Sequence, residues 1–237
     1  MPSPAYFTPV GFGGRYPRMR WIFFDVGGVL VNEEATLKHF ASTIQGLLAG
    51  HGIRVPVEKI ERIQLEAARG FGSVTRAVIS SLTPDKGIGN KVYGDLWRKA
   101  RNLDEPYPEA VEVLRRLSSA YGLGVIANQL PGSRERLRRF GFTKYLSVYA
   151  LSDELQVSKP DDAIFSYALK AANCMPSEAV MVGDRVDNDI IPAKRLGMRS
   201  VRVLRGIFVN QKASGADELP DAEIRSLTEL IGIDLLK

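Results

Sequence analysis

Four short segments of the chain could do chemistry: three carry carboxylates or a lysine beside glycine or proline, and one carries two side-chain amides. The segments are Asp25-Val26-Gly27-Gly28, Ile126-Ala127-Asn128-Gln129, Ser158-Lys159-Pro160-Asp161, and Val182-Gly183-Asp184 with Asp189 five residues further on. Carboxylate oxygens are hard ligands that suit Mg²⁺, and a lysine ammonium can neutralise either acids or a phosphoryl group. Each segment alone also fits a helix cap or an ordinary turn. Their chemistry therefore depends on whether the fold brings them together.

The elements around these segments predict a common position for them. Residues 20–25 form a short apolar and aromatic run that ends in a carboxylate, which predicts a buried strand. Beyond residue 106 the pattern alternates between helix and strand, with strands expected at 122–127, 147–151, 179–182 and 200–204, and helices at 111–120, 133–140, 163–172 and 189–196. This alternation predicts an α/β fold with a Rossmann-like, doubly wound parallel sheet. Ligands of such sheets bind beyond the carboxyl ends of the strands, where the four segments fall.

The sequence between the first and second predicted strands is helical instead. Apolar residues recur there at helical spacing over about seventy residues, and glycine and proline breaks divide them into about four helices. We therefore expect an α/β core domain made of residues 19–33 and 103–237, and an inserted small helical cap domain at 34–102. Residues 1–18 are expected to be a frayed tail.

Composition excludes several classes of protein. The 237 residues are 45% hydrophobic and 25% charged, which is typical of a globular chain with a core of its own. The longest apolar runs are strand-sized, so no membrane segment is predicted. The net charge of +5 is spread along the chain and is a weak argument for nucleic acid, so none is expected as a partner. A single cysteine fits a reducing compartment, and the cytoplasm is the expected location.

Taken in order, the four segments resemble the motifs of the haloacid dehalogenase (HAD)-like hydrolase superfamily, in its phosphatase-type members with a helical cap. The resemblance implies that Asp25 is the nucleophile and forms an aspartyl-phosphate that water then hydrolyses. It also implies a Mg²⁺ ion held by Asp25, the backbone carbonyl of Gly27, Asp184 and Asp189. Lys159 would neutralise the acids and the transferring phosphoryl group.

The phosphate-binding residues implied by the same resemblance are Gly28, Asn128, Gln129 and Lys159. The glycine leaves room for phosphate to approach the backbone, and the side chains of the other three carry hydrogen-bond donors. Asp187, between the two metal-binding acids, is expected to be solvated.

Two positions depart from the family pattern. Most phosphatases of the superfamily carry a second Asp two residues after the nucleophile, where this chain has Gly27. That Asp protonates the leaving group and activates water, a contribution of about 10²–10⁴-fold. Ala127 replaces a Ser or Thr that usually donates a hydrogen bond to phosphate.

These features predict a Mg²⁺-dependent phosphomonoester phosphatase that acts on a small soluble phosphorylated metabolite, such as a sugar phosphate or a nucleotide, as a monomer or homodimer. One alternative is a phosphate-metabolite binding protein that kept the scaffold and lost the reaction, suggested by Gly27 and Ala127. Another is a C–P hydrolase of the phosphonoacetaldehyde type. That enzyme would need a cap lysine for a Schiff base, with Lys38, Lys59, Lys91 and Lys99 as candidates.

Overall fold

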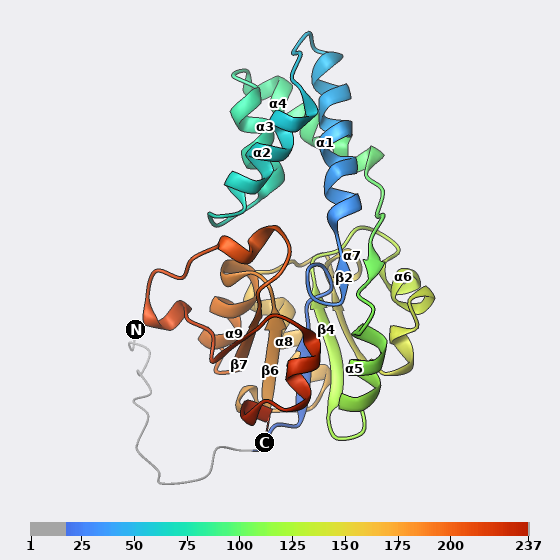
Figure 1. Ribbon diagram of the computed structural model, residues 1–237, viewed down its shortest axis with the longest axis vertical. Helices are drawn as coiled ribbons and strands as arrows, with labels where there is room; N and C mark the ends of the chain where they lie inside the picture. The colour runs from blue at the N-terminus through green and yellow to red at the C-terminus, as the bar shows by residue number, and fades with distance from the viewer. Residues whose placement is uncertain (1–17, 237) are drawn as a thin grey trace, which may run out of the picture.

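The computed structural model describes residues 18–236, so the expected tail lies almost entirely outside the described residues. Six parallel strands form one sheet in the order β5-β4-β1-β6-β7-β8, which confirms the predicted α/β class (Figure 1). The strands are β1 (Trp21–Phe24), β4 (Gly122–Ala127), β5 (Val148–Leu151), β6 (Ala179–Gly183), β7 (Arg199–Val203) and β8 (Ala222–Ile224). The sequence did not indicate β8, whose three residues carry too short a pattern to distinguish a strand from a loop.

Helices cover both faces of the sheet because successive side chains of each strand point to opposite sides. In β1, Phe23 joins a buried cluster with Ile164 and Phe165, whereas Ile22 and Phe24 join the cluster on the other face. The first face carries α8 (Asp162–Ala171) and α9 (Ile191–Arg195), and the second carries α5 (Ala110–Leu117) and α6 (Ser133–Arg139). The strands are therefore apolar on both sides, as expected of a covered parallel sheet.

A separate helical body stands beyond one end of the sheet (Figure 1). It consists of α1 (Glu34–Ala49), α2 (Val57–Ala67), α3 (Val74–Leu82) and α4 (Lys86–Lys99). These helices have a hydrophobic cluster of their own, which includes Phe40, Ile44, Leu48, Ile60, Val78, Ile79, Val92 and Leu96. The helical body therefore packs mainly on itself.

The chain enters and leaves the helical body at neighbouring positions. The outgoing β2 (Val31–Asn32) pairs antiparallel with the returning β3 (Glu105–Pro106). Just beyond this pair, the Thr36 hydroxyl donates to the Asp104 carboxylate at 2.5 Å and accepts from the backbone N–H of Leu103 at 2.8 Å. The two crossings therefore form a single hydrogen-bonded connection between the helical body and the sheet.

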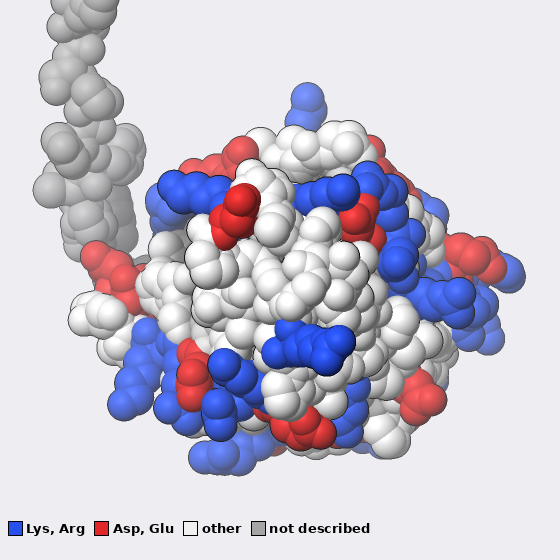
Figure 2. All heavy atoms as spheres, turned by 90° about the horizontal axis from the view of Figure 1, so that it is seen from above, with Lys and Arg blue, Asp and Glu red and all other residues white. Residues whose placement is uncertain are grey.

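The surface at the helical-body end mixes charges of both signs. Figure 2 shows lysine and arginine interspersed with acidic side chains around a largely uncharged centre. No helix within residues 18–236 is long and apolar enough to cross a membrane.

The core also contains a short helix, α7 (Ser152–Leu155), which follows β5 directly.

Candidate active site

The sheet register places the predicted acids at one edge. Phe24 pairs with Val125 of β4 on one side and with Val182 of β6 on the other, so Asp25 emerges between the ends of these two strands. Asp184 follows the last residue of β6, and Asp189 lies in the π-helical turn at 186–190 that precedes α9. Carboxylate oxygens of Asp25, Asp184 and Asp189 all lie within 4.8 Å of one another. Three hard oxygen ligands at this separation fit a divalent cation.

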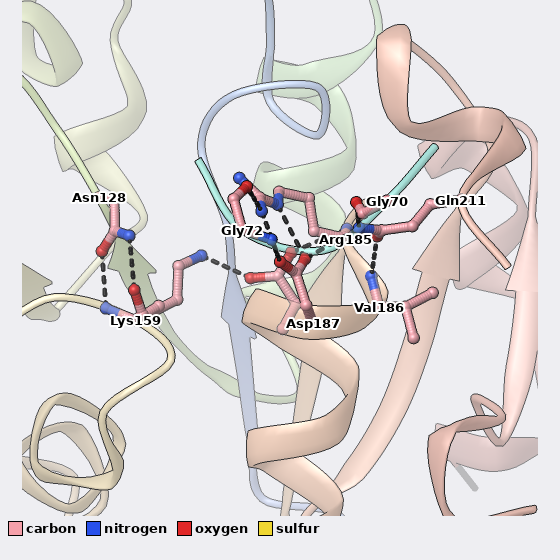
Figure 3. Close-up of polar contacts among 9 residues, drawn as sticks. Gly70, Gly72, Asn128, Lys159, Arg185, Val186, Asp187 and Gln211 are labelled. Atoms are coloured by element: carbon pink, nitrogen blue, oxygen red, sulfur yellow. Dashed lines mark hydrogen bonds and ion pairs between the residues drawn. The ribbon is translucent and has the colours of Figure 1, made fainter. Parts of the chain in front are cut away.

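Lys159 joins this group from the loop after α7. Its ammonium lies 3.0 Å from Oδ1 of Asp25 and 2.5 Å from Oδ1 of Asp189, and its side chain is almost fully buried. The side chain of Asn128 fixes the lysine backbone: its amide donates to the Lys159 carbonyl at 2.9 Å, and its oxygen accepts from the Lys159 N–H at 2.8 Å (Figure 3). Asn128 therefore positions the lysine.

The electrostatics reflect an excess of negative charge. Burial and the carboxylates of Asp25 and Asp189 raise the pKa of Asp184 well above its usual value. Burial and Asp25 likewise raise the pKa of Asp189 to about 6, although Lys159 acts in the opposite direction. Burial alone would lower the pKa of Lys159, but the two neighbouring carboxylates outweigh it and the pKa is raised. The lysine is therefore charged, and one ammonium faces three acids, so the cluster is suited to receive a cation.

Small residues make room for these acids. Gly28 has φ +66°, and a Cβ at this position would lie 2.2 Å from an oxygen of Asp184. A side chain there would displace the carboxylate, so glycine is needed both for the backbone conformation and for space. The N–H of Gly28 donates to the Val31 carbonyl at 2.9 Å, so this donor is used within the turn.

Glu33 is a site residue that the sequence analysis missed. It directly precedes α1, and its carboxylate lies over Gly27, where a Cβ would be 2.2 Å from Oε1. Burial raises the pKa of Glu33 to about 8, with further contributions from Asp104 and Asp25. The available signal was the pairing of a glycine at the unusual position 27 with an acid six residues later, but only the fold shows that they meet.

A cavity of about 520 Å³ lies between the sheet edge and the helical body. The core contributes Asp25, Lys159 and Asp184, while the helical body contributes neutral and aromatic side chains, including Phe40, Tyr93 and Trp97. A second cavity of about 450 Å³ adjoins it, and Glu33 and Asp184 line both. A small ligand can therefore contact the acids and the helical body at the same time.

The helical body is also tied to the core opposite the β2–β3 connection. Asp187 accepts a hydrogen bond from the N–H of Gly72 at 2.8 Å, Arg185 donates to the Gly72 carbonyl at 2.9 Å, and Gln211 donates to the Gly70 carbonyl at 2.8 Å (Figure 3). Arg185 and Asp187 are themselves an ion pair at 2.6 Å. We call these five residues the latch. The expectation that Asp187 is solvated is therefore wrong, since its side chain is only 10% exposed and holds the α2–α3 loop.

The remaining candidates do not line the cavity over Asp25, although Lys38 lines the adjoining one. Gln129 is not among the residues that line the cavity over Asp25; its side-chain oxygen accepts from Arg136 at 3.2 Å. Ala127 is fully buried at the end of β4. None of the four cap lysines named as Schiff-base candidates lines that cavity either, and Lys38 instead pairs with Glu34 at 2.7 Å.

Comparison with known proteins yields a consistent set of relatives. The family model of haloacid dehalogenase-like hydrolases matches residues 19–197. A glyceraldehyde 3-phosphate phosphatase of Pyrococcus abyssi is 36% identical over 192 residues, which cover 76% of this chain and 79% of that protein. The phosphatase of the same name from Methanocaldococcus jannaschii is 39% identical over 130 residues, covering 54% of this chain and 56% of the relative. The chain thus spans little more than half the length of some curated relatives it matches.

The fold has counterparts among solved structures. A HAD phosphatase from Thermococcus onnurineus superposes with a TM-score of 0.60 at 24% identity, covering 90% of this chain and 96% of that chain. This likeness extends over the sheet and the helical body together.

Proposed function

Because this chain belongs to the haloacid dehalogenase-like hydrolases, we propose that it is a Mg²⁺-dependent phosphatase that cleaves the phosphomonoester of a small metabolite. The observation that carries the proposal is Asp25 at the end of the central strand, within 3.0 Å of Lys159 and beside two further acids. Relatives named glyceraldehyde 3-phosphate phosphatase and phosphoglycolate phosphatase support a small phosphorylated substrate.

The reaction proceeds in two displacements at phosphorus. An oxygen of Asp25 forms a bond to phosphorus as the bond to the leaving oxygen breaks, which gives an aspartyl-phosphate and an alcohol. Water then attacks the same phosphorus, the bond to Asp25 breaks, and inorganic phosphate leaves. Lys159 pairs with Asp25 at 3.0 Å and stabilises the negative charge that develops on the phosphoryl oxygens.

Asp25, Asp184 and Asp189, together with the backbone carbonyl of Gly27, would hold the Mg²⁺ ion. The fit rests on the three converging carboxylates and on the raised pKa of Asp184, which show more negative charge than Lys159 can balance. A bound Mg²⁺ would supply positive charge that polarises the phosphoryl group.

The helical body, residues 34–102, acts as the cap in this proposal. It covers the cavity over Asp25 with apolar and neutral polar side chains, which exclude water and select the leaving group. The latch holds it near the sheet. The proposal places the protein in the cytoplasm as a monomer or homodimer, supported by its single cysteine and family.

The test is phosphate release with Mg²⁺ from a panel of sugar phosphates, nucleotides and p-nitrophenyl phosphate. We compare the protein with Asp25→Asn and with Asp162→Asn, a matched control whose carboxylate pairs with Arg195 at the surface. Release that requires both Mg²⁺ and Asp25 supports a phosphatase. Bound phosphate without any turnover would instead identify a binding protein on this scaffold.

A further inference from the structure

We propose that Glu33 is the general acid and base of the reaction, acting from outside the nucleophile segment. The inference rests on the proposed phosphatase function and adds the group that handles protons. Three observations carry it: where the carboxylate lies, what it contacts, and which other acids are already engaged.

The first observation is the position of the carboxylate. A Cβ built on Gly27 would lie 2.2 Å from Oε1 and 2.5 Å from Oε2 of Glu33. The carboxylate thus fills the volume into which a side chain two residues after the nucleophile would project. A side chain at position 27 and the Glu33 carboxylate as placed here would occupy the same space, so glycine at 27 leaves room for this carboxylate.

The second observation is that this carboxylate forms, with the residues that the structure describes, none of the hydrogen bonds or ion pairs that would give it a structural role. Glu33 occupies the N-cap of α1, where an acidic side chain normally accepts a hydrogen bond from the first turn of the helix. Here it makes no such bond, and within residues 18–236 no hydrogen bond or ion pair engages it. Instead it lines both cavities beside Asp184.

The third observation concerns the other acids of the cavity over Asp25. They are Asp25, Glu33 and Asp184, of which the nucleophile and the cation ligand account for two. Lys159 is already bound by two carboxylates. Glu33 is therefore the acid among these lining residues that remains available to transfer a proton.

The proton balance is complete with Glu33. When the bond between phosphorus and the leaving oxygen breaks, the Glu33 carboxyl gives its proton to that oxygen, which leaves as the alcohol. In the second step the attacking water gives a proton to the Glu33 carboxylate as its oxygen binds phosphorus and the bond to Asp25 breaks. The enzyme returns to its starting state, and one phosphomonoester and one water have become an alcohol and phosphate.

The experiment separates the two half-reactions by leaving group. With an alkyl phosphate, Glu33→Gln is expected to lose about 10²–10⁴-fold in kcat, because an alkoxide needs a proton to leave. With p-nitrophenyl phosphate, whose leaving group is stable without a proton, the variant should release the first equivalent of nitrophenolate rapidly and then turn over slowly. Glu58→Gln, an exposed glutamate on α2, is the matched control.

A relocation variant distinguishes a catalytic role from a structural one. Glu33→Ala should be as slow as Glu33→Gln. Adding Gly27→Asp to Glu33→Ala should raise kcat at least tenfold, since the new carboxylate enters the space that Glu33 has left. Circular dichroism and thermal melting confirm that each variant folds.

The outcomes are distinct. Equal losses for alkyl and nitrophenyl substrates without a burst, or full activity of Glu33→Gln, would overturn the role of Glu33 while leaving the phosphatase intact. A wild-type protein with no phosphate release that depends on Mg²⁺ and Asp25 would overturn the proposed function, and this inference with it.

Discussion

The sheet and the helical body bury their polar groups in different ways. The described part of the core buries charged side chains at its functional edge, including Lys159, Asp184 and Asp189. The buried polar residues of the helical body, 34–102, are the neutral Thr36, Gln64 and Thr83. Burying charges is costly unless they are paired, so the core gives up stability at the site. The helical body carries no such cost. Chemistry is thus held at the edge of the sheet, while the helical body offers mainly shape and apolar surface.

Replacing one acid of the cluster should give the largest effect and separate stability from activity. Asp184→Asn removes a like charge from three converging carboxylates, so activity should fall by about 10³-fold or more while the metal-free protein becomes about 1–2 kcal/mol more stable. Phosphate release and thermal melting in EDTA measure both changes. A loss of stability together with activity would show that the acids are structural and would remove the contrast with the helical body.

Cavity-forming changes test whether the two regions unfold separately. Ile44→Ala in the helical body and Phe23→Ala in the sheet should each cost about 2–5 kcal/mol, because both side chains are almost fully buried. The first should expose only 34–99 to early hydrogen exchange, since this body has its own hydrophobic cluster. Simultaneous exchange throughout the chain in Ile44→Ala would show a single cooperative unit.

The latch should matter less, and mainly for substrate binding. Asp187→Ala removes the acceptor of the Gly72 N–H and the ion-pair partner of Arg185. This change should weaken the attachment of the helical body to the core by about 1–3 kcal/mol. We expect KM to rise about 5- to 50-fold with a smaller change in kcat. Faster exchange of the Gly72 amide should accompany it. Asp221→Ala, which removes an acceptor for Ser200 just before β8, serves as the control. An unchanged KM in Asp187→Ala would argue that the latch is incidental.

The smallest expected effect is a pH dependence of stability that arises at the connection between the two regions. Burial raises the pKa of Asp104 in the folded protein despite its hydrogen bonds from Thr36 and Asn102. The ionised form is thus disfavoured by folding, and the contribution of Asp104 to stability is present at pH below its unfolded value and lost as pH rises through the folded one. Relative to Asp104→Asn, the wild-type protein should therefore lose stability in urea unfolding as the pH rises above the usual pKa of an aspartate. A difference that stays constant with pH would contradict this.

The sequence predicted the edge of the sheet because each relevant strand is an apolar run that ends at a polar residue. Asp25, Lys159, Asp184 and Asp189 follow from that pattern, and the structure brings all four together. The position of Glu33 could not be predicted, because it depends on a side chain that is missing at position 27.

The latch was equally hidden from the sequence. Its contacts join residues more than a hundred positions apart, from the α2–α3 loop to the segments that follow β6 and β7. The phosphate-binding role expected for Gln129 stays a prediction: unlike its neighbour Asn128, it is not among the residues that line the cavity over Asp25.

The connection formed by β2 and β3 has an evolutionary consequence. Because Val31 pairs with Pro106, the helical body that begins after Glu33 is an excursion whose ends are adjacent in space. Such a segment can be lengthened, shortened or exchanged without shifting the register of any strand in the sheet. The helical body can therefore change in the course of evolution, and the range of substrates with it. The acids and the lysine at the edge of the sheet are meanwhile inherited unchanged.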